Sequence, residues 1–256
     1  MKKIRRDVGR IWDEVEGEAG MLAGMGILLA LIETVVYMMQ IDRSRFAICL
    51  LDPFAMVSYT AGVTMVPLGA LMGMFLLREE FRMERLVRMQ KKSRIWLGAC
   101  IKIAVAALWT AVVCTLWCGI LGKITANATY TWNDVTSIYY FITGRVAEAI
   151  SYEKVCWYFF AGIFFAVWAS GMVVLFSYWL SGSYVWGMLI VIVFSAIGTF
   201  NHYPYDFYRG AGYFIVSESF QWKYQIILPI IVVFVCVGVG FWMQRKDFLL
   251  KEKQGE

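Results

Sequence analysis

The chain has 256 residues, of which 60% are hydrophobic and 17% are charged, and its mean hydropathy is +0.62. An ordinary soluble protein has about 25% charged residues, so this composition favours a membrane protein. The aromatic share of 17% excludes a disordered chain. The net charge of +5 is modest. Lys and Arg stand in blocks beside apolar runs, so we expect no binding to nucleic acid.

The N-terminal segment has apolar residues at helical spacing. They fall at steps of 4, 3, 1 and 3 and form one stripe: Ile4, Val8, Ile11, Trp12 and Val15. The basic residues of this segment lie mostly off the stripe. We therefore expect residues 1–20 to form an amphipathic helix that lies flat on the inner membrane surface. Packing of the same helix on a soluble partner is the alternative.

Six apolar runs follow. A hydrocarbon core of about 30 Å needs roughly 20 apolar residues in a helix, and lipid offers no partners to an open backbone, so each run is expected to be helical. The sequence predicts an all-α membrane protein with a transmembrane domain over 21–243 and a tail over 244–256. Its six transmembrane helices are expected at 21–40, 53–77, 96–122, 155–180, 184–200 and 224–243.

The distribution of basic residues predicts the orientation. With the N-terminus inside, the inner segments hold 16 Lys or Arg and the outer segments hold 7, while Lys102 lies inside a span. An excess of Lys and Arg marks the cytoplasmic side. We therefore expect a multi-pass protein of the cell membrane with both termini in the cytoplasm.

The inner connection 78–94 reads REEFRMERLVRMQKKSR. It has seven basic and three acidic residues, and it also has an apolar content that the positive-inside rule alone does not require. We expect part of it to form a short cytoplasmic helix that contacts a partner. A solvated, charged extension of the neighbouring spans is the alternative.

The outer segment 201–223 is rich in Tyr, Phe and Gly, and we expect it to re-enter the outer leaflet before the last span.

Two ionisable residues fall inside predicted spans. Glu33 lies about 18 Å along the first span, and a charge at that depth usually faces protein or water. It is either a polar contact at a dimer interface or in a translocation path, or a protonated or hydrogen-bonded carboxyl that holds two spans together. Lys102 lies about 9 Å into the third span. We interpret it as an anchor that reaches the inner interface, and we expect no direct pair with Glu33.

At this point the layout resembles that of the ABC type-2 transporter permease family. Glu79 and Glu80 close the second span, as the family often shows. The segment SRIWLGACIK, in which Lys102 follows Arg94 by eight residues, is similar to the family's entry into the third span. The ending FWMQRKDFLLKEK is similar to its closing pattern. The segment 78–94 departs from the family because it has neither the Gly nor the Pro often found there.

The resemblance implies the membrane subunit of an ATP-driven exporter. Two separate ABC ATPase subunits would supply ATP and Mg, and a second permease protomer, identical or different, would complete the path. The segment 78–94 would be the coupling helix. Its apolar residues would enter a groove on the ATPase and its charged residues would form the rim: Phe81, Leu86 and Met89 within, and Glu79, Glu80, Glu84 and Arg85 around them. The expected cargo is peptide-, antimicrobial- or lipid-like.

A different class remains open. The chain would then be a non-transporting membrane scaffold or sensor that binds a cytosolic partner through 78–94. We expect no catalytic site, because no GxxxxGK[ST] motif is present to bind ATP phosphates. We also expect no metal and no cofactor on this chain, since His202 is the only histidine and a metal site usually needs three or four ligands.

Overall fold

A computed structural model describes residues 17–41, 48–77, 92–128, 130–143, 146, 150–200 and 226–243. In these ranges every element is helical, apart from one isolated bridge between Cys49 and Ala128, so the all-α prediction is confirmed. The helices are α2 (Ala19–Gln40), α3 (Asp52–Ala61), α4 (Met65–Leu77), α6 (Lys92–Thr125), α7 (Ile138–Thr143), α8 (Tyr152–Ser181), α9 (Val185–Phe200) and α11 (Leu228–Met243).

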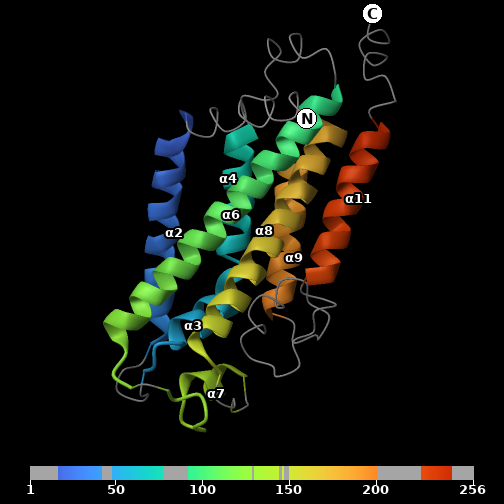
Figure 1. The fold of residues 1–256 in the computed structure, drawn as a ribbon. Coiled ribbons are helices and arrows are strands. Elements are labelled where there is room, and N and C mark those ends of the chain that lie inside the picture. The colour runs from blue at the N-terminus through green and yellow to red at the C-terminus, as the bar shows by residue number, and fades with distance from the viewer. Residues whose placement is uncertain are drawn as a thin grey trace, which may run out of the picture.

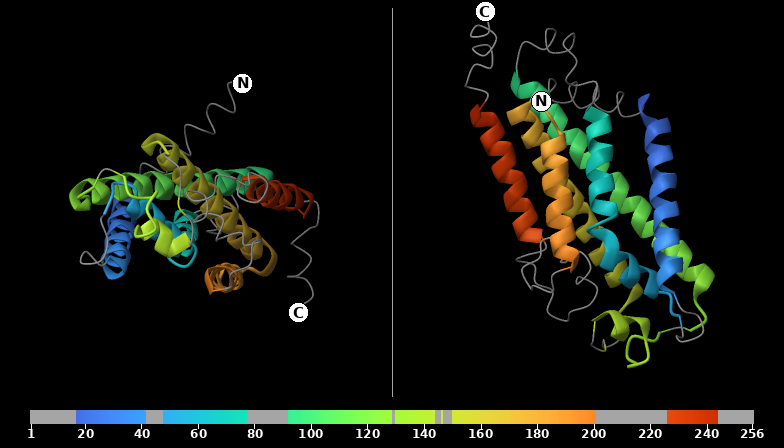
Figure 2. Two further views of the ribbon diagram at one scale, coloured as in Figure 1. Left: turned by 90° about the horizontal axis from the view of Figure 1, so that it is seen from below. Right: turned by 180° about the vertical axis from the view of Figure 1, so that it is seen from behind.

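The helices run up and down one bundle (Figure 1). α2 runs toward the end that holds α7, α3 and α4 return, α6 goes down again, α8 returns, and α9 and α11 complete the alternation. We call the end with α7 the α7 end. We call the opposite end, where α2 begins and α11 ends, the terminal end. Seen along the bundle, α2 and α11 lie toward opposite ends of the tilted α6 (Figure 2).

Three helices are long and apolar enough to cross a membrane: Ala19–Met39, Ile95–Thr125 and Tyr152–Ser181. They indicate a multi-pass membrane protein. The apolar helices Met65–Leu77, Val185–Ser195 and Leu228–Trp242 are shorter. The predicted spans 96–122 and 155–180 lie within α6 and α8, which extend beyond them at both ends.

The structure divides the predicted span 53–77 into two helices, α3 and α4, separated by a turn at 62–64. Pro67, in the first turn of α4, gives the physical reason. Its ring has no N–H to donate to the carbonyl of Val63 and would collide with that carbonyl in a continuous helix. The carbonyl of Thr60 instead accepts the N–H groups of both Val63 and Thr64, at 3.0 and 3.1 Å.

Four predicted segments lie outside the described residues. The amphipathic helix at 1–20 is described only from residue 17, where α2 is about to begin. Of the segment 78–94 predicted to contain the coupling helix, residues 78–91 lie outside and 92–94 belong to α6. The predicted re-entrant segment 201–223 and the tail 244–256 lie wholly outside. α7 is a short helix in the connection between α6 and α8 that the sequence did not predict.

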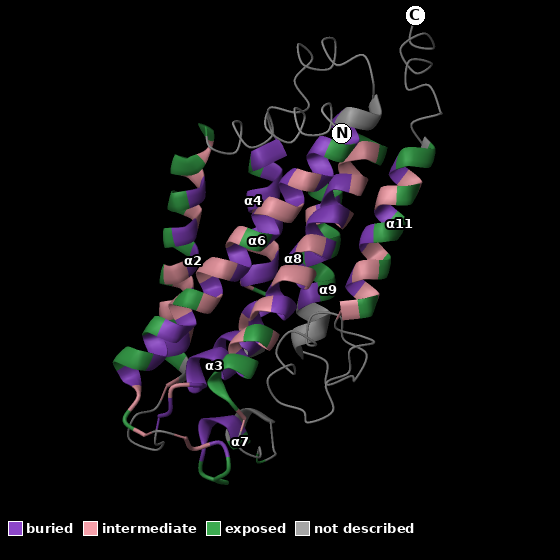
Figure 3. Cartoon of the chain, viewed as in Figure 1, coloured by how far each residue is buried: buried purple, intermediate pink, exposed green. Residues whose placement is uncertain are grey.

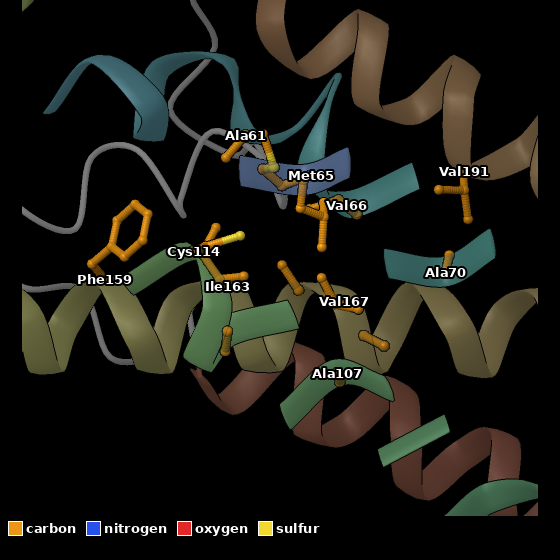
Figure 4. Close-up of a cluster of buried hydrophobic side chains, with 14 of the residues drawn as sticks. Ala61, Met65, Val66, Ala70, Ala107, Cys114, Phe159, Ile163, Val167 and Val191 are labelled. Atoms are coloured by element: carbon orange, nitrogen blue, oxygen red, sulfur yellow. The ribbon is translucent and has the colours of Figure 1, made fainter. Parts of the chain in front are cut away.

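α8 lies at the centre of the bundle and packs against α4, α6, α9 and α11. Buried residues concentrate along it and along α4 (Figure 3). Glycines bring the helices close: the side chain of Ile103 on α6 fits between Gly73 of α4 and Gly171 of α8, and a Cβ at either glycine would lie 2.6 Å from it. One α8 turn below, Val167 packs into the space left by Gly69 (Figure 4).

α2 packs less broadly. Its buried residues form one narrow stripe that faces α6: Leu22, Gly26, Leu29, Glu33 and Tyr37. The opposite face is apolar and exposed at Ile27, Leu28, Leu31, Val35, Met38 and Met39. α2 is therefore held to the bundle by one stripe, which contacts α6 over most of its length and also reaches α4 at Leu22 and α3 at Tyr37.

We expect Gly187→Ala to destabilise the α8–α9 packing. A Cβ at Gly187 would lie 2.7 Å from the Cα of Val174 and 2.9 Å from the Cβ of Ser177. Because these atoms belong to the α8 backbone and its first side-chain carbons, no rotamer change relieves the overlap, and overpacking of this kind costs about 1–3 kcal/mol. Thermal unfolding of the purified protein in detergent measures the loss. Gly24→Ala is the matched control, since its Cβ meets nothing within 4 Å; equal melting of the two variants would contradict the prediction.

Candidate functional site

The residues proposed for ATPase coupling lie outside the described part of the chain. They are Glu79, Glu80, Phe81, Glu84, Arg85, Leu86 and Met89, all within the connection 78–91. The described residues on either side are Leu77, which ends α4, and Lys92, which begins α6. Both lie at the terminal end of the bundle. The connection therefore starts and finishes at the end where α2 begins.

Glu33 lies on the buried stripe of α2 and its exposed fraction is 0%. Its side chain faces α6, where Cys114 and Cys118 are its titratable neighbours. Neither carboxyl oxygen has a hydrogen-bond partner of good geometry among the described residues, and a thiol is only a weak donor. In this state Glu33 is thus enclosed between two helices of one chain, away from the exposed face of α2.

Polar contacts on both sides of Glu33 join α2 to α6. Toward the terminal end, the indole of Trp109 donates to the carbonyl oxygen of Leu22 at 3.0 Å. Next to Glu33, the indole of Trp117 donates to the Thr34 hydroxyl at 2.9 Å. One turn further, the hydroxyls of Tyr37 and Thr125 lie 2.7 Å apart. We call this line of contact the α2–α6 seam.

Lys102 is buried near the terminal end of α6, with an exposed fraction of 4%. It precedes Cys114 by 12 residues, which is about 18 Å along the helix axis. Glu33 packs at the level of Cys114 and Cys118. The structure therefore does not bring Glu33 and Lys102 together.

A second polar site lies at the α7 end, around Asp52. This carboxyl is fully buried, and each of its oxygens accepts one N–H: the Cys49 backbone at 2.6 Å and the Trp132 indole at 2.7 Å. Trp132 in turn stacks on Tyr139 of α7, with ring centroids 4.5 Å apart. A residue at the start of α3 thus holds the connection between α6 and α8.

The connection between α2 and α3 and the connection between α6 and α8 are also joined through their backbones. Asn127 accepts the N–H of Ile48 on its side-chain oxygen at 2.8 Å. The carbonyl of Ile48 accepts the N–H groups of Asn127 and Ala128 at 2.9 and 3.0 Å. Gly122 lets this approach happen, because a Cβ there would lie against the carbonyl oxygen of Leu50. We call the contacts of Asp52 and Ile48 with residues 127–132 the α7-end clamp.

Burial raises the pKa of Asp52 above its ordinary value of 3.8, and the N–H groups of Cys49 and Trp132 partly oppose the rise. The folded protein therefore binds this proton more tightly than the unfolded chain does. By linkage, the contribution of Asp52 to stability is greatest below its ordinary pKa and is lost as the pH rises through its folded-state pKa. The exposed Asp134 behaves in the opposite way: hydrogen bonds from Thr136 lower its pKa.

The sequence analysis missed the α7-end clamp. Its polar members are far apart in the chain and belong to no motif. One signal was present: Asp52 stands immediately before an apolar run that starts with Pro53, which is a helix-start pattern. Nothing in the sequence connects Asp52 to Trp132, which lies 80 residues later.

Comparison with protein-family models, with curated proteins and with solved structures finds no match to this chain.

We expect Trp132→Phe to lower the free energy of unfolding by about 1–3 kcal/mol, the cost of leaving a buried acceptor unpaired. The phenyl ring keeps an aromatic surface on Tyr139 but removes the N–H that Asp52 accepts. Loss of that donor also raises the pKa of Asp52 further. The fall in stability with rising pH should then extend to higher pH than in the wild type. Denaturation in detergent at a series of pH values measures both effects.

Trp157→Phe is the control for that experiment. Trp157 is 62% exposed and lies in the second turn of α8, near the α7 end. A surface change of this kind usually stays within about 0.5 kcal/mol. If Trp132→Phe matches this control in stability and in pH profile, the hydrogen bond to Asp52 does not stabilise the fold.

Proposed function

We propose that the chain is the membrane-spanning permease subunit of an ATP-driven exporter that moves a peptide-, antimicrobial- or lipid-like cargo. In this proposal six segments cross the membrane: α2, α3 with α4, α6, α8, α9 and α11. The observation that carries it is the alternation of these apolar segments, which brings the basic connection 78–91 back to the end where α2 begins and α11 ends. That arrangement suits an element that is contacted from the cytoplasm.

The mechanism has three steps. ATP and Mg close a dimer of two partner ATPase subunits. Phe81, Leu86 and Met89, anchored in a groove of the ATPase, move with it and carry the motion to α4 and α6, between which the connection lies. The path between this permease and a second protomer then switches access. The packing supports the second step: α4 and α6 meet at Gly73 and Ile103, so a displacement at their terminal ends reaches the centre of the bundle.

The exposed apolar face of α2 supports the expected second protomer. Ile27, Leu31 and Val35 lie on this face and have exposed fractions of 63%, 58% and 53%. A face of this kind is covered in the membrane by lipid or by another helix. We place the second permease protomer or lipid against it. The proposed cargo class suits a path that is mostly apolar and poor in charge.

The direct test is a tagged pull-down of the full chain from mild detergent, with an ATPase assay on the material that co-purifies. We expect an ATPase subunit to co-purify with the wild type. Phe81→Asp/Leu86→Asp should reduce its recovery, or its coupled activity, at least about tenfold, because each charge would enter an apolar groove and about 1.4 kcal/mol already gives a tenfold change.

Val135→Asp/Val146→Asp is the matched control. It also places two aspartates at exposed apolar positions, but at the α7 end, and it should leave the recovery unchanged. If the wild type brings down no nucleotide-binding subunit, the exporter has no source of energy and the proposal fails. Recovery of a cytosolic partner without ATPase activity would support the scaffold or sensor instead.

A further inference from the structure

The enclosed carboxyl of Glu33 is not used by the proposed coupling mechanism. It is fully buried, and neither oxygen has a hydrogen-bond partner of good geometry in the described residues. An ionised carboxylate without a partner at such a site is strongly unfavourable. A neutral carboxyl is less costly. Among the described residues, the closed α2–α6 seam offers this group no more than a weak contact with the Cys114 thiol. The closed seam therefore favours the neutral carboxyl, whereas a carboxylate needs a second state in which the group meets water.

The surroundings restrict the ligand. A metal ion needs several oxygen, nitrogen or sulfur ligands, and the described residues contain no group of three or more His, Cys, Asp or Glu that could hold one. An organic cation needs space, but the exposed fraction of Glu33 is 0%. A proton needs neither additional ligands nor volume. It is the cation that fits the enclosed site.

We propose that Glu33 is a proton-binding site, which holds its proton while α2 is packed on α6 and releases it to water when the α2–α6 seam opens. The reaction is the loss of one proton from the carboxyl, which leaves a carboxylate exposed to solvent. Glu33 lies seven residues before Gln40, the end of α2, or about 10 Å from the α7 end. Water from that end is therefore the acceptor. This inference concerns the single chain and does not depend on the proposed function.

The construction of α2 suits such an opening. Only its narrow stripe is buried, and its other side is exposed. The hydrogen bonds of the seam use side chains of Trp109, Trp117 and Tyr37, which exchange their partners for water when the helices separate. Of these hydrogen bonds, the one between Trp117 and Thr34 lies nearest to Glu33 along α2, because Thr34 is the next residue.

The other titratable groups around Glu33 supply no positive charge. On α6 they are the thiols of Cys114 and Cys118. On α2 itself the hydroxyl of Tyr37 is bonded to Thr125. α3 carries Asp52, which is held in the α7-end clamp, and Tyr59, whose side chain is outside the described residues; α4 has no titratable residue. The ionisation of Glu33 is thus not offset by an ion pair in the seam.

Alkylation of Cys114 measures the opening directly. Cys114 is fully buried beside Glu33 and also belongs to the core cluster that contains Ile163 of α8. N-ethylmaleimide reaches it only when the packing around it opens, and the comparison with Glu33→Gln isolates the opening that depends on Glu33. The purified full chain in detergent is treated across a pH series, and each cysteine is quantified by mass spectrometry. The ratio of the wild-type rate to the Glu33→Gln rate should increase with pH, by up to about tenfold per pH unit, because opening is linked to the release of one proton. A nearby Glu33 carboxylate disfavours the thiolate of Cys114, so its direct effect on the thiol would lower the wild-type rate and does not produce the expected increase.

Two controls make the result specific. Cys100 is buried on the same helix next to Cys236 of α11, away from the seam, and its rates should be equal in the two proteins. Glu153→Gln, an exposed glutamate at the start of α8, should behave as the wild type. Equal pH profiles of Cys114 in wild type and Glu33→Gln would overturn the proposal.

Infrared spectroscopy of Asp52→Asn, which removes the other buried carboxyl of the described residues, provides a measurement that does not depend on the folding of Glu33→Gln. The carbonyl band of a buried protonated carboxyl should be present at neutral pH and should disappear in step with the increase in Cys114 alkylation. A protein without such a band at neutral pH, or with a band that persists while Cys114 becomes reactive, would also contradict a proton site at Glu33.

Discussion

Close approach of helix backbones is the constraint on which the bundle depends. Inside a membrane, lipid is as apolar as a leucine side chain, so helices are held together by tight packing rather than by exclusion of water. Ile103 is the clearest case: it occupies the space that Gly73 and Gly171 leave open on two different helices. This contact joins α4, α6 and α8 at one point, and the packing of α9 and α11 on α8 extends from it.

The buried carboxyls of Asp52 and Glu33 differ in their hydrogen bonding. Asp52 receives an N–H on each oxygen, and these two hydrogen bonds join the start of α3 to the connection that follows α6. Glu33 receives none of good geometry among the described residues and lies in a helix whose other side is exposed. A satisfied polar group specifies one arrangement of its surroundings, whereas an unsatisfied one favours a change of arrangement. The fold thus combines the hydrogen-bonded α7-end clamp with the α2–α6 seam, whose opening we propose.

The sequence predicted the helical elements well, because apolar runs and helical periodicity are local properties. α2 begins two residues before the predicted span and ends with it, and α8 extends the prediction by three residues at its start and one at its end. Pro67 in the run predicts a kink, but not the complete separation into α3 and α4 at the turn 62–64. The α7-end clamp was missed because Asp52 and Trp132 are brought together only by the packing of α3, α6 and α7. The burial of Glu33 was predicted from its position in the run, but the face of α2 on which it lies was not.

The α7-end clamp has a consequence for the biosynthesis of the protein. The first helical hairpin, α2 with α3, leaves the ribosome early, yet the backbone of Ile48 and the carboxyl of Asp52 bond to residues 127–132. The Ile48 backbone and one oxygen of Asp52 therefore lack these partners until α6 and the connection that follows it have been made. The hairpin that is made first is completed only after the third apolar segment is in the membrane. Translocation machinery or water at the membrane surface must satisfy its polar groups during that interval.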